Sequence, residues 1–149
     1  LDGRNIAYSS RNDCYNRKAK PEWSRLITVI KYFQKLGFSV HSYVPFWIRM
    51  QDQNIHQKLD ETSKLHYSNI SDDDPECDDK DMLAWTLLTD GYFVSNDQMR
   101  IHIDDGLIQP EWKVNHRIGF EFDEGTFIPH PPNGLEFSHD EIQEDNENA

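Results

Sequence analysis

The sequence has 149 residues, enough for one folded domain with a single sizeable core. No stretch approaches the roughly 18 consecutive apolar residues of a membrane-spanning helix, and the two cysteines supply neither a zinc-binding motif nor a disulfide framework, so composition excludes a transmembrane protein and a domain held by disulfides. The net charge of −12 is divided unevenly, because residues 1–70 carry 11 Lys and Arg against 6 Asp and Glu, whereas residues 71–149 carry 4 against 21. A basic half can face a polyanion and an acidic half can hold cations, but charge alone decides neither.

The chain opens with L-D-G-R-N, an acid and an amide on either side of Gly3 and Arg4. Apolar Leu1 is expected to end a buried strand, which places Asp2 and Asn5 on a loop at the carboxyl end of that strand. Open α/β sheets bind their ligands at this edge. The opening residues are therefore the first candidate for a functional site.

The first half of the chain alternates helical and strand patterns. Apolar residues recur at helical spacing through residues 21–36, and Gly37 suits the position just past the helix end. Alternation predicts a strand over residues 38–44, stopped by a proline. A polar helix over residues 51–64 and a short strand over 65–68 follow. The apolar face of the first helix is expected to contain Trp23, Leu26, Ile27, Ile30 and Phe33.

A second helix is predicted over residues 78–89, after an acidic, turn-rich loop at 68–77. Gly91 is expected to cap this helix, and the buried strand Y-F-V-S at 92–95 leads into N-D-Q-M-R, which is read as a loop. The residues expected inside the second helix are Met82, Leu83, Trp85 and Leu88.

The last predicted elements are a helix over residues 110–117 and two strands over 118–122 and 126–130. Helices that alternate with short apolar strands favour an α/β fold built on a parallel sheet. The domain is predicted to span residues 1–130, with its first strand truncated, and residues 131–149 are predicted to form an acidic, disordered tail.

Acidic residues follow two strand ends and open one helix. Asp2 and Asp97 lie after strands, and Asp78 and Asp79 begin the second helix. Because strand ends and helix starts share one edge of a parallel sheet, these four carboxylates are expected to converge. Crowded carboxylates repel one another, and a hard divalent cation relieves the repulsion. The alternative is that the helix-start acids serve as caps and the other two as turn residues.

Four short motifs, in order, resemble a known ribonuclease family. D-G-R-N at residues 2–5, Y-V-P-F-W at 43–47, C-D-D-K at 77–80 and F-V-S-N-D at 93–97 are similar to the D-G-S-N, V-P-x-W, Y-D-D-R and V-S-N-D motifs of the Zc3h12a-like (Regnase-type) NYN ribonuclease domain, a branch of the PIN-like nucleases. The resemblance covers roughly residues 1–130. It implies a three-layer PIN-like fold with a central, mainly parallel sheet flanked by helices.

The resemblance implies a metal-dependent endoribonuclease that uses Mg²⁺ or Mn²⁺ and a metal-activated water to cut single-stranded or loop RNA, in mRNA decay or small-RNA silencing. It implies a cytoplasmic protein, with the nucleus and RNA granules as alternatives. Its expected partners are proteins of those pathways, and a homodimer is a further expectation. Metal ligands would be Asp2, Asp79 and Asp97. The catalytic set would be Asp2, Asn5, Asp78, Asp79 and Asp97. Contacts to RNA would come from Arg4, Arg11, Lys18, Trp47, Arg49 and Lys80.

Two departures from the family pattern keep a second reading open. The family often carries another acid four residues beyond its S-N-D motif, where this chain has Ile101, and three neighbours could compensate: His102, Asp104 and Asp105. The loop before the Asp pair is acidic here and often basic in the family. A catalytically impaired domain that serves as an RNA-binding or protein-interaction scaffold is therefore the alternative. A phosphotransfer domain is excluded, because D-G-R-N lacks the pattern that follows a nucleophilic aspartate.

Overall fold

The first two residues of the chain join two small β-sheets. The Tyr43 amide donates to the Leu1 carbonyl at 3.0 Å, and the Asp2 amide donates to the Val94 carbonyl at 3.0 Å. Leu1 and Asp2 therefore hydrogen-bond a strand on either side, as expected for the end of a buried central strand. The computed structural model describes residues 1–9, 21–48, 53–62, 64–69 and 73–137.

Each sheet contains a parallel pair of strands. In the first sheet, β1 (His41–Pro45) pairs in parallel with β2 (Lys64–Ser68). In the second, β3 (Phe93–Val94) pairs in parallel with β4 (Arg117–Asp123), which also pairs with β5 (Thr126–His130). The carboxyl ends of β1, β3 and the Leu1–Asp2 segment consequently face one edge of the molecule.

The pairing of β4 with β5 is antiparallel, which corrects the expectation of a wholly parallel sheet. Only Glu124 and Gly125 connect the two strands, and both have positive φ, 50° and 81°. A two-residue turn can reverse the chain into a hairpin but cannot make the crossover that a parallel pair needs.

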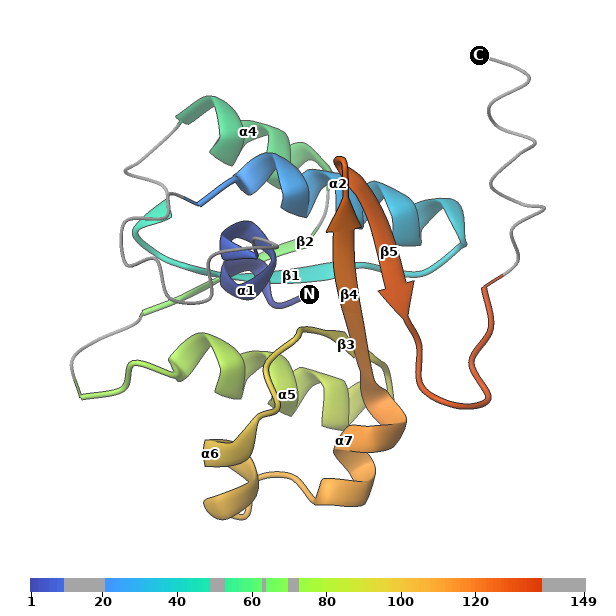
Figure 1. Cartoon of the computed structure of the whole chain (residues 1–149). Helices are drawn as coiled ribbons and strands as arrows, with labels where there is room; N and C mark the ends of the chain where they lie inside the picture. The colour runs from blue at the N-terminus through green and yellow to red at the C-terminus, as the bar shows by residue number, and fades with distance from the viewer. Residues whose placement is uncertain (10–20, 49–52, 63, 70–72, 138–149) are drawn as a thin grey trace.

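Helices cover both faces of the first sheet. In Figure 1, α2 and α4 lie on one side of β1 and β2, and α5 lies on the other, which gives the three layers of an α/β fold. The described helices are α1 (Gly3–Tyr8), α2 (Trp23–Lys35), α4 (Gln53–Thr62), α5 (Cys77–Thr89), α6 (Arg100–Asp104) and α7 (Pro110–His116).

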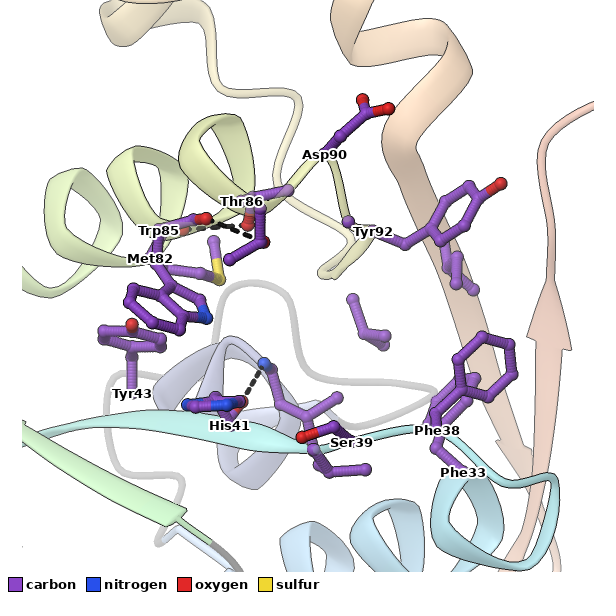
Figure 2. Close-up of a pocket in the computed structure, with 16 residues that line it drawn as sticks. Phe33, Phe38, Ser39, His41, Tyr43, Met82, Trp85, Thr86, Asp90 and Tyr92 are labelled. Atoms are coloured by element: carbon purple, nitrogen blue, oxygen red, sulfur yellow. Dashed lines mark hydrogen bonds between the residues drawn. The ribbon is translucent and has the colours of Figure 1, made fainter.

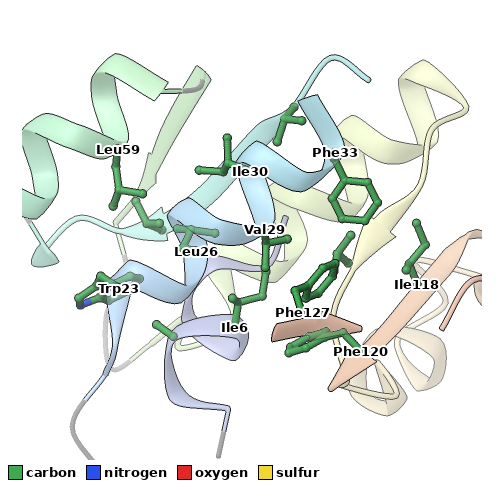
Figure 3. Close-up of a cluster of buried hydrophobic side chains, with 14 of the residues drawn as sticks. Ile6, Trp23, Leu26, Val29, Ile30, Phe33, Leu59, Ile118, Phe120 and Phe127 are labelled. Atoms are coloured by element: carbon green, nitrogen blue, oxygen red, sulfur yellow. The ribbon is translucent and has the colours of Figure 1, made fainter. Parts of the chain in front are cut away.

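The buried apolar residues form two clusters, a larger and a smaller core, and helix α2 supplies much of the larger core. It begins at Trp23 behind an N-cap at Glu22, so Pro21 lies just outside the helix rather than at its first position as expected. Gly37 follows the C-cap with φ of +88°, the left-handed conformation that glycine adopts without a steric penalty. The buried face of α2 packs against both sheets (Figure 3). It contains Val29, whereas Ile27, which the sequence places on this face, is only half-buried. The buried residues of α2 are Trp23, Leu26, Val29, Ile30 and Phe33.

Helix α5 buries a narrower stripe than the sequence predicts. Met82 and Leu83 are buried as expected, but Trp85 is 37% exposed and Leu88 is 77% exposed, so the prediction for these two is wrong. The stripe runs through Asp78 and Asp79 into Met82, Leu83 and Thr86, and the other two residues fall outside it. Asp90, and not Gly91, takes the left-handed position at the helix end, with φ of 51°.

One segment predicted as a loop is helical, because L-D-G-R-N turns into α1 directly after Asp2. N-D-Q-M-R is a loop as far as Met99, and its last residue, Arg100, begins α6. The predicted helix at 51–64 is too long, because β2 already begins at Lys64. The predicted strand at 38–44 begins later, at His41, and includes Pro45, which pairs with Ser68 of β2.

The segment after β5 returns to the core. Leu135 and Phe137 pack against the larger core, and the Phe137 ring lies 5.7 Å from that of Phe33 on α2. The domain boundary at residue 130 stays a prediction, and residues 138–149 of the predicted tail lie outside the described residues. No helix in the described part of the chain has the length and apolar character needed to cross a membrane.

Candidate functional site

Three buried carboxylates meet where the Leu1–Asp2 segment ends and α5 begins. Asp2 follows the central segment, and Asp78 and Asp79 lie in the first turn of α5. They are 3%, 1% and 4% exposed, and one oxygen from each lies within 4.8 Å of the other two. The topology thus brings together three of the four acids that the sequence expected at this edge.

Each oxygen of the Asp2 carboxylate accepts a hydrogen bond. Its Oδ1 accepts from the Asn5 amide at 3.2 Å, which caps α1, and its Oδ2 accepts from the buried Ser95 Oγ at 2.7 Å. The side chain of Asn5 accepts from the Asn96 amide at 2.9 Å, and Ser95 Oγ accepts from the Asp97 amide at 3.1 Å. Asn5 therefore fastens α1 to the loop after β3, so that this loop keeps its position beside Asp2.

Asp97 stands apart from the three buried acids. It is exposed, and its Oδ1 accepts from the Met99 amide at 2.7 Å, which closes a local turn. It lines a cavity of about 340 Å³ together with Glu76 and His102. Among the described residues, Asp97 belongs to neither group of metal-capable side chains, so its predicted role as a metal ligand stays a prediction.

Asp78 has one oxygen paired and one oxygen without a partner. The Arg4 guanidinium lies 2.9 Å from Asp78 Oδ1 and also donates to the Pro75 carbonyl at 3.3 Å. No group within the described residues hydrogen-bonds the buried Oδ2. A buried carboxylate oxygen with no donor carries the full cost of desolvation, which a cation at this position would remove.

A second group of side chains adjoins the first and shares Asp79 with it. Glu76, Asp79 and His102 each place one ligand atom within 4.8 Å of the others. Sequence reasoning did not assign Glu76 to the site, although it stands three residues before Asp79. His102 was only one of three alternatives, because a histidine in a five-residue helix carries no periodic signal of its own.

The electrostatics of the site favour protonation or a cation. Burial raises the pKa of Asp79 well above its ordinary value, and the charges of Asp2 and Glu76 raise it further. Burial also raises the pKa of Asp2, against the hydrogen bonds from Ser95 and Asn5 that lower it. The pKa of Asp78 is raised by burial, which the nearby guanidinium opposes. In the absence of a cation, these carboxylates destabilise the fold when they ionise.

The metal-free protein is expected to lose stability at this site as the pH rises. Because the pKa values of Asp2 and Asp79 in the folded state lie above the ordinary 3.8, the folded state binds more protons than the unfolded state does. The stability that these two groups contribute is therefore greatest below about pH 4 and is lost as the pH rises through neutral. Asp2→Asn keeps a capping side chain but cannot ionise. Denaturant unfolding from pH 4 to pH 8 should show a shallower fall for this variant than for wild type, and parallel curves would contradict the expectation.

The residues predicted to bind RNA are only partly described. Trp47 is half-buried and packs edge-on against Trp23, with ring centroids 6.1 Å apart. The exposed Lys80 ammonium lies 2.9 Å from Asp74, and Arg4 is paired with an acid of the site as given above. Contacts of these residues with RNA stay a prediction. Arg11, Lys18 and Arg49 lie outside the described residues.

A separate cavity of about 320 Å³ lies between β1 and the second half of α5 (Figure 2). It is lined by residues at the amino ends of the strands, among them His41 and Tyr92, and by Trp85 of α5. His41 Nδ1 lies 2.8 Å from Nε2 of His66 on the neighbouring strand. None of the three buried carboxylates lines this cavity, so it forms no part of the site.

Comparisons with known proteins agree with this geometry. The family model described as the Zc3h12a-like Ribonuclease NYN domain matches residues 1–143, and no curated protein matches the chain. Two structures of nuclear protein-only RNase P 2 (PRORP2) from Arabidopsis thaliana superpose with a TM-score of 0.64 at 19% identity, each covering 91% of this chain and 30% of the other. The predicted PIN-like α/β fold is confirmed, and the present chain spans about a third of those proteins.

Proposed function

This chain belongs to the Zc3h12a-like ribonuclease NYN domain family, and from that premise we propose that it is a metal-dependent endoribonuclease that hydrolyses single-stranded or loop RNA. Family membership gives the ribonuclease-type function and an RNA substrate. The observation that carries the metal dependence is the unpartnered, buried Oδ2 of Asp78 beside the carboxylates of Asp2 and Asp79.

The side chains of the site fit a hard divalent cation. All donors of the first group are carboxylate oxygens, which Mg²⁺ and Mn²⁺ prefer. Asp2 and Asp79 would hold the ion together with Asp78, whose free oxygen faces no described donor. When bound, the ion supplies an activated water and balances the charge that develops on the phosphate oxygens.

The protein's own groups would set the geometry of the reaction. The Ser95 hydroxyl donates a hydrogen bond to one oxygen of Asp2 and accepts one from the Asp97 amide. It therefore links the exposed Asp97 to the buried Asp2. We propose that Asp97, from its place in this turn, orients the activated water or helps to hold the ion. Asn5 would keep the turn in place through its bond to the Asn96 amide.

The biological setting is part of the proposal. We propose a cytoplasmic role in mRNA decay or small-RNA silencing, with proteins of those pathways as partners. Its support is family membership.

One contact favours a second candidate. The Arg4 guanidinium already lies 2.9 Å from Asp78 and partly neutralises the acidic group. A protein in which this ion pair replaces the cation would keep the fold and the RNA surface without cleavage. Failure to bind Mn²⁺, with RNA binding retained, would select this scaffold function.

The proposed function is tested by cleavage of a 5′-labelled single-stranded RNA in Mg²⁺ or Mn²⁺. Asp97→Asn is expected to lower the cleavage rate by at least about 10²-fold with the fold retained, because the exposed carboxylate has no part in packing. Asp60→Asn, an exposed acid on α4, serves as the matched control and should cut as fast as wild type. Cleavage that survives EDTA, or that is equal in the two variants, would overturn the proposal.

A further inference from the structure

Another cavity adjoins the acidic site. It has a volume of about 530 Å³ and is lined by the end of α1, the first turns of α2 and the hairpin of β4 and β5. Asn96 also lines it, and this residue stands between Ser95, which donates to Asp2, and the exposed Asp97. One wall of the cavity therefore belongs to the loop that carries groups of the site.

The side chain of Asn96 fixes this wall against β4. Its Nδ2 donates to the Phe120 carbonyl and its Oδ1 accepts from the Phe120 amide, both at 2.9 Å. The backbone amide of Asn96 donates to the Asn5 side chain, also at 2.9 Å. Because these groups of Asn96 are used within the protein, Asn96 shapes the cavity and the other lining residues are left to recognise a ligand.

Arg25 supplies a flat group in the wall of the cavity. Its guanidinium donates to the Ser9 carbonyl, lies 3.3 Å from the Glu22 carboxylate and stands 5.5 Å from the centre of the Phe122 ring. These three contacts hold the guanidinium in place, and the side chain stays 24% exposed. Proteins that bind single-stranded RNA stack bases on guanidinium planes and aromatic rings. Arg25 therefore offers a stacking surface for a base.

The charge of the cavity excludes phosphate. Three exposed glutamates line it: Glu22, Glu121 and Glu124. Among the described lining residues, Arg25 alone carries a positive charge, and it is already paired. Carboxylates repel a phosphate, but they accept hydrogen bonds from the N–H groups of a base. The part of an RNA chain that fits this cavity is therefore a base rather than the backbone.

Guanine is the base whose Watson–Crick edge suits these acceptors. Its N1–H and N2–H donors are adjacent and match the two oxygens of a carboxylate. Uracil places carbonyl oxygens on both sides of its N–H group, and adenine and cytosine each present an acceptor nitrogen beside their amino group. Carboxylates would repel all of these acceptors.

We propose that this cavity binds a guanine next to the scissile bond of the RNA, stacked on Arg25 and recognised by the three glutamates. The inference deepens the proposed function and rests on it, because the guanine would belong to the RNA that is cut.

The test is the binding of short single-stranded RNAs to the full chain in EDTA. An oligouridine that contains one central guanine is expected to bind at least about 10-fold more tightly than oligouridine alone, the effect of a hydrogen bond to a charged group. Inosine at the same position lacks the N2 amino group and should lose most of this preference. Equal binding of the guanine and uridine RNAs by wild type would overturn the inference.

A triple variant separates recognition of the base from the effect of charge. Glu22→Gln, Glu121→Gln and Glu124→Gln together should remove the preference for guanine. At the same time the affinity for both RNAs should rise, because negative charge that repels the RNA backbone is lost. A purely electrostatic role of these glutamates would raise both affinities and leave their ratio unchanged, which would contradict the inference.

A second triple variant removes the same charge elsewhere. Glu61→Gln, Glu111→Gln and Glu136→Gln replace three exposed acids that do not line the cavity, and this variant should keep the preference of wild type. Loss of the preference in this control as well would also overturn the inference.

Cleavage in Mn²⁺ separates this inference from the proposed function. RNA that is cut by a protein with no preference for guanine would refute the guanine site and leave the nuclease intact. A guanine preference that depends on the three glutamates, in a protein that never cuts RNA, would support a guanine-binding cavity and refute the nuclease.

Discussion

Replacement of Asp79 by asparagine is expected to abolish metal-dependent RNA cleavage and, at the same time, to stabilise the metal-free protein. Asp79 is 4% exposed and takes part in both groups of metal-capable side chains, so its loss removes a carboxylate from both. We expect a fall in rate of at least about 10³-fold, above the cost of losing a single oxyanion-hole donor.

The gain in stability has the same origin as the loss of activity. Burial and the charge of Asp2 raise the pKa of Asp79, so at neutral pH its ionised form is disfavoured in the folded state, and a neutral amide of similar size removes that cost. The melting temperature in EDTA should rise by roughly 3–8 °C, about what one or two kcal/mol give for a chain of this length.

Calorimetry in EDTA and in Mn²⁺ measures both effects. Mn²⁺ should raise the melting temperature of wild type and leave that of Asp79→Asn unchanged, because binding to the folded state is what stabilises it. Asp60→Asn again provides the control. A variant that melts below wild type in EDTA would show that Asp79 is ionised and well paired in the fold, contrary to the arrangement described here.

Gly3→Ala is expected to destabilise the protein by about 3 kcal/mol or more. A Cβ atom at this position would lie 2.6 Å from Val44 Cγ1 and 2.7 Å from the Tyr43 carbonyl oxygen, and the latter belongs to the backbone of β1 and cannot move aside. Because α1 starts at Gly3, the displacement would also shift the adjoining Asp2 and lower metal affinity.

Gly91→Ala is the matched control for this effect. Its Cβ would meet only Thr89 Oγ1, at 3.3 Å, and a side chain can rotate away. In denaturant unfolding, the free energy of unfolding of the Gly3 variant should be well below that of the Gly91 variant and of wild type. Equal stability of the two variants would mean that α1 is able to separate from β1 without cost.

The parts of the fold that the sequence predicts well have strong local signals. The apolar residues of α2 recur at helical spacing over 13 residues, and Gly37 marks its end, so its existence and buried face follow from the pattern. The three buried acids are predictable for another reason. Each directly follows a strand or opens a helix, and topology then decides that they meet.

The parts that the sequence does not predict depend on contacts between distant segments. Helix α6 has only five residues, and its position beside Asp79 follows from packing against the smaller core through Met99 and Ile108. In α5, apolar residues occur all round the helix, so the pattern cannot say that Trp85 and Leu88 face outward. The 3.8 Å approach of His102 to Asp79 depends on the same packing and has no local signal in the sequence.

The position of Asp2 has a consequence for how members of this family change over evolutionary time. Asp2 joins the two sheets through its backbone, caps α1 and anchors Ser95. Asp79 contacts Glu76 and the His102 imidazole, and burial disfavours its ionised form. In a lineage released from selection for catalysis, replacement of Asp79 would improve folding, and most replacements of Asp2 would impair it. Drift is therefore expected to erase the second acid of the site long before the first, and a retained Asp2 is a poor marker of a working nuclease.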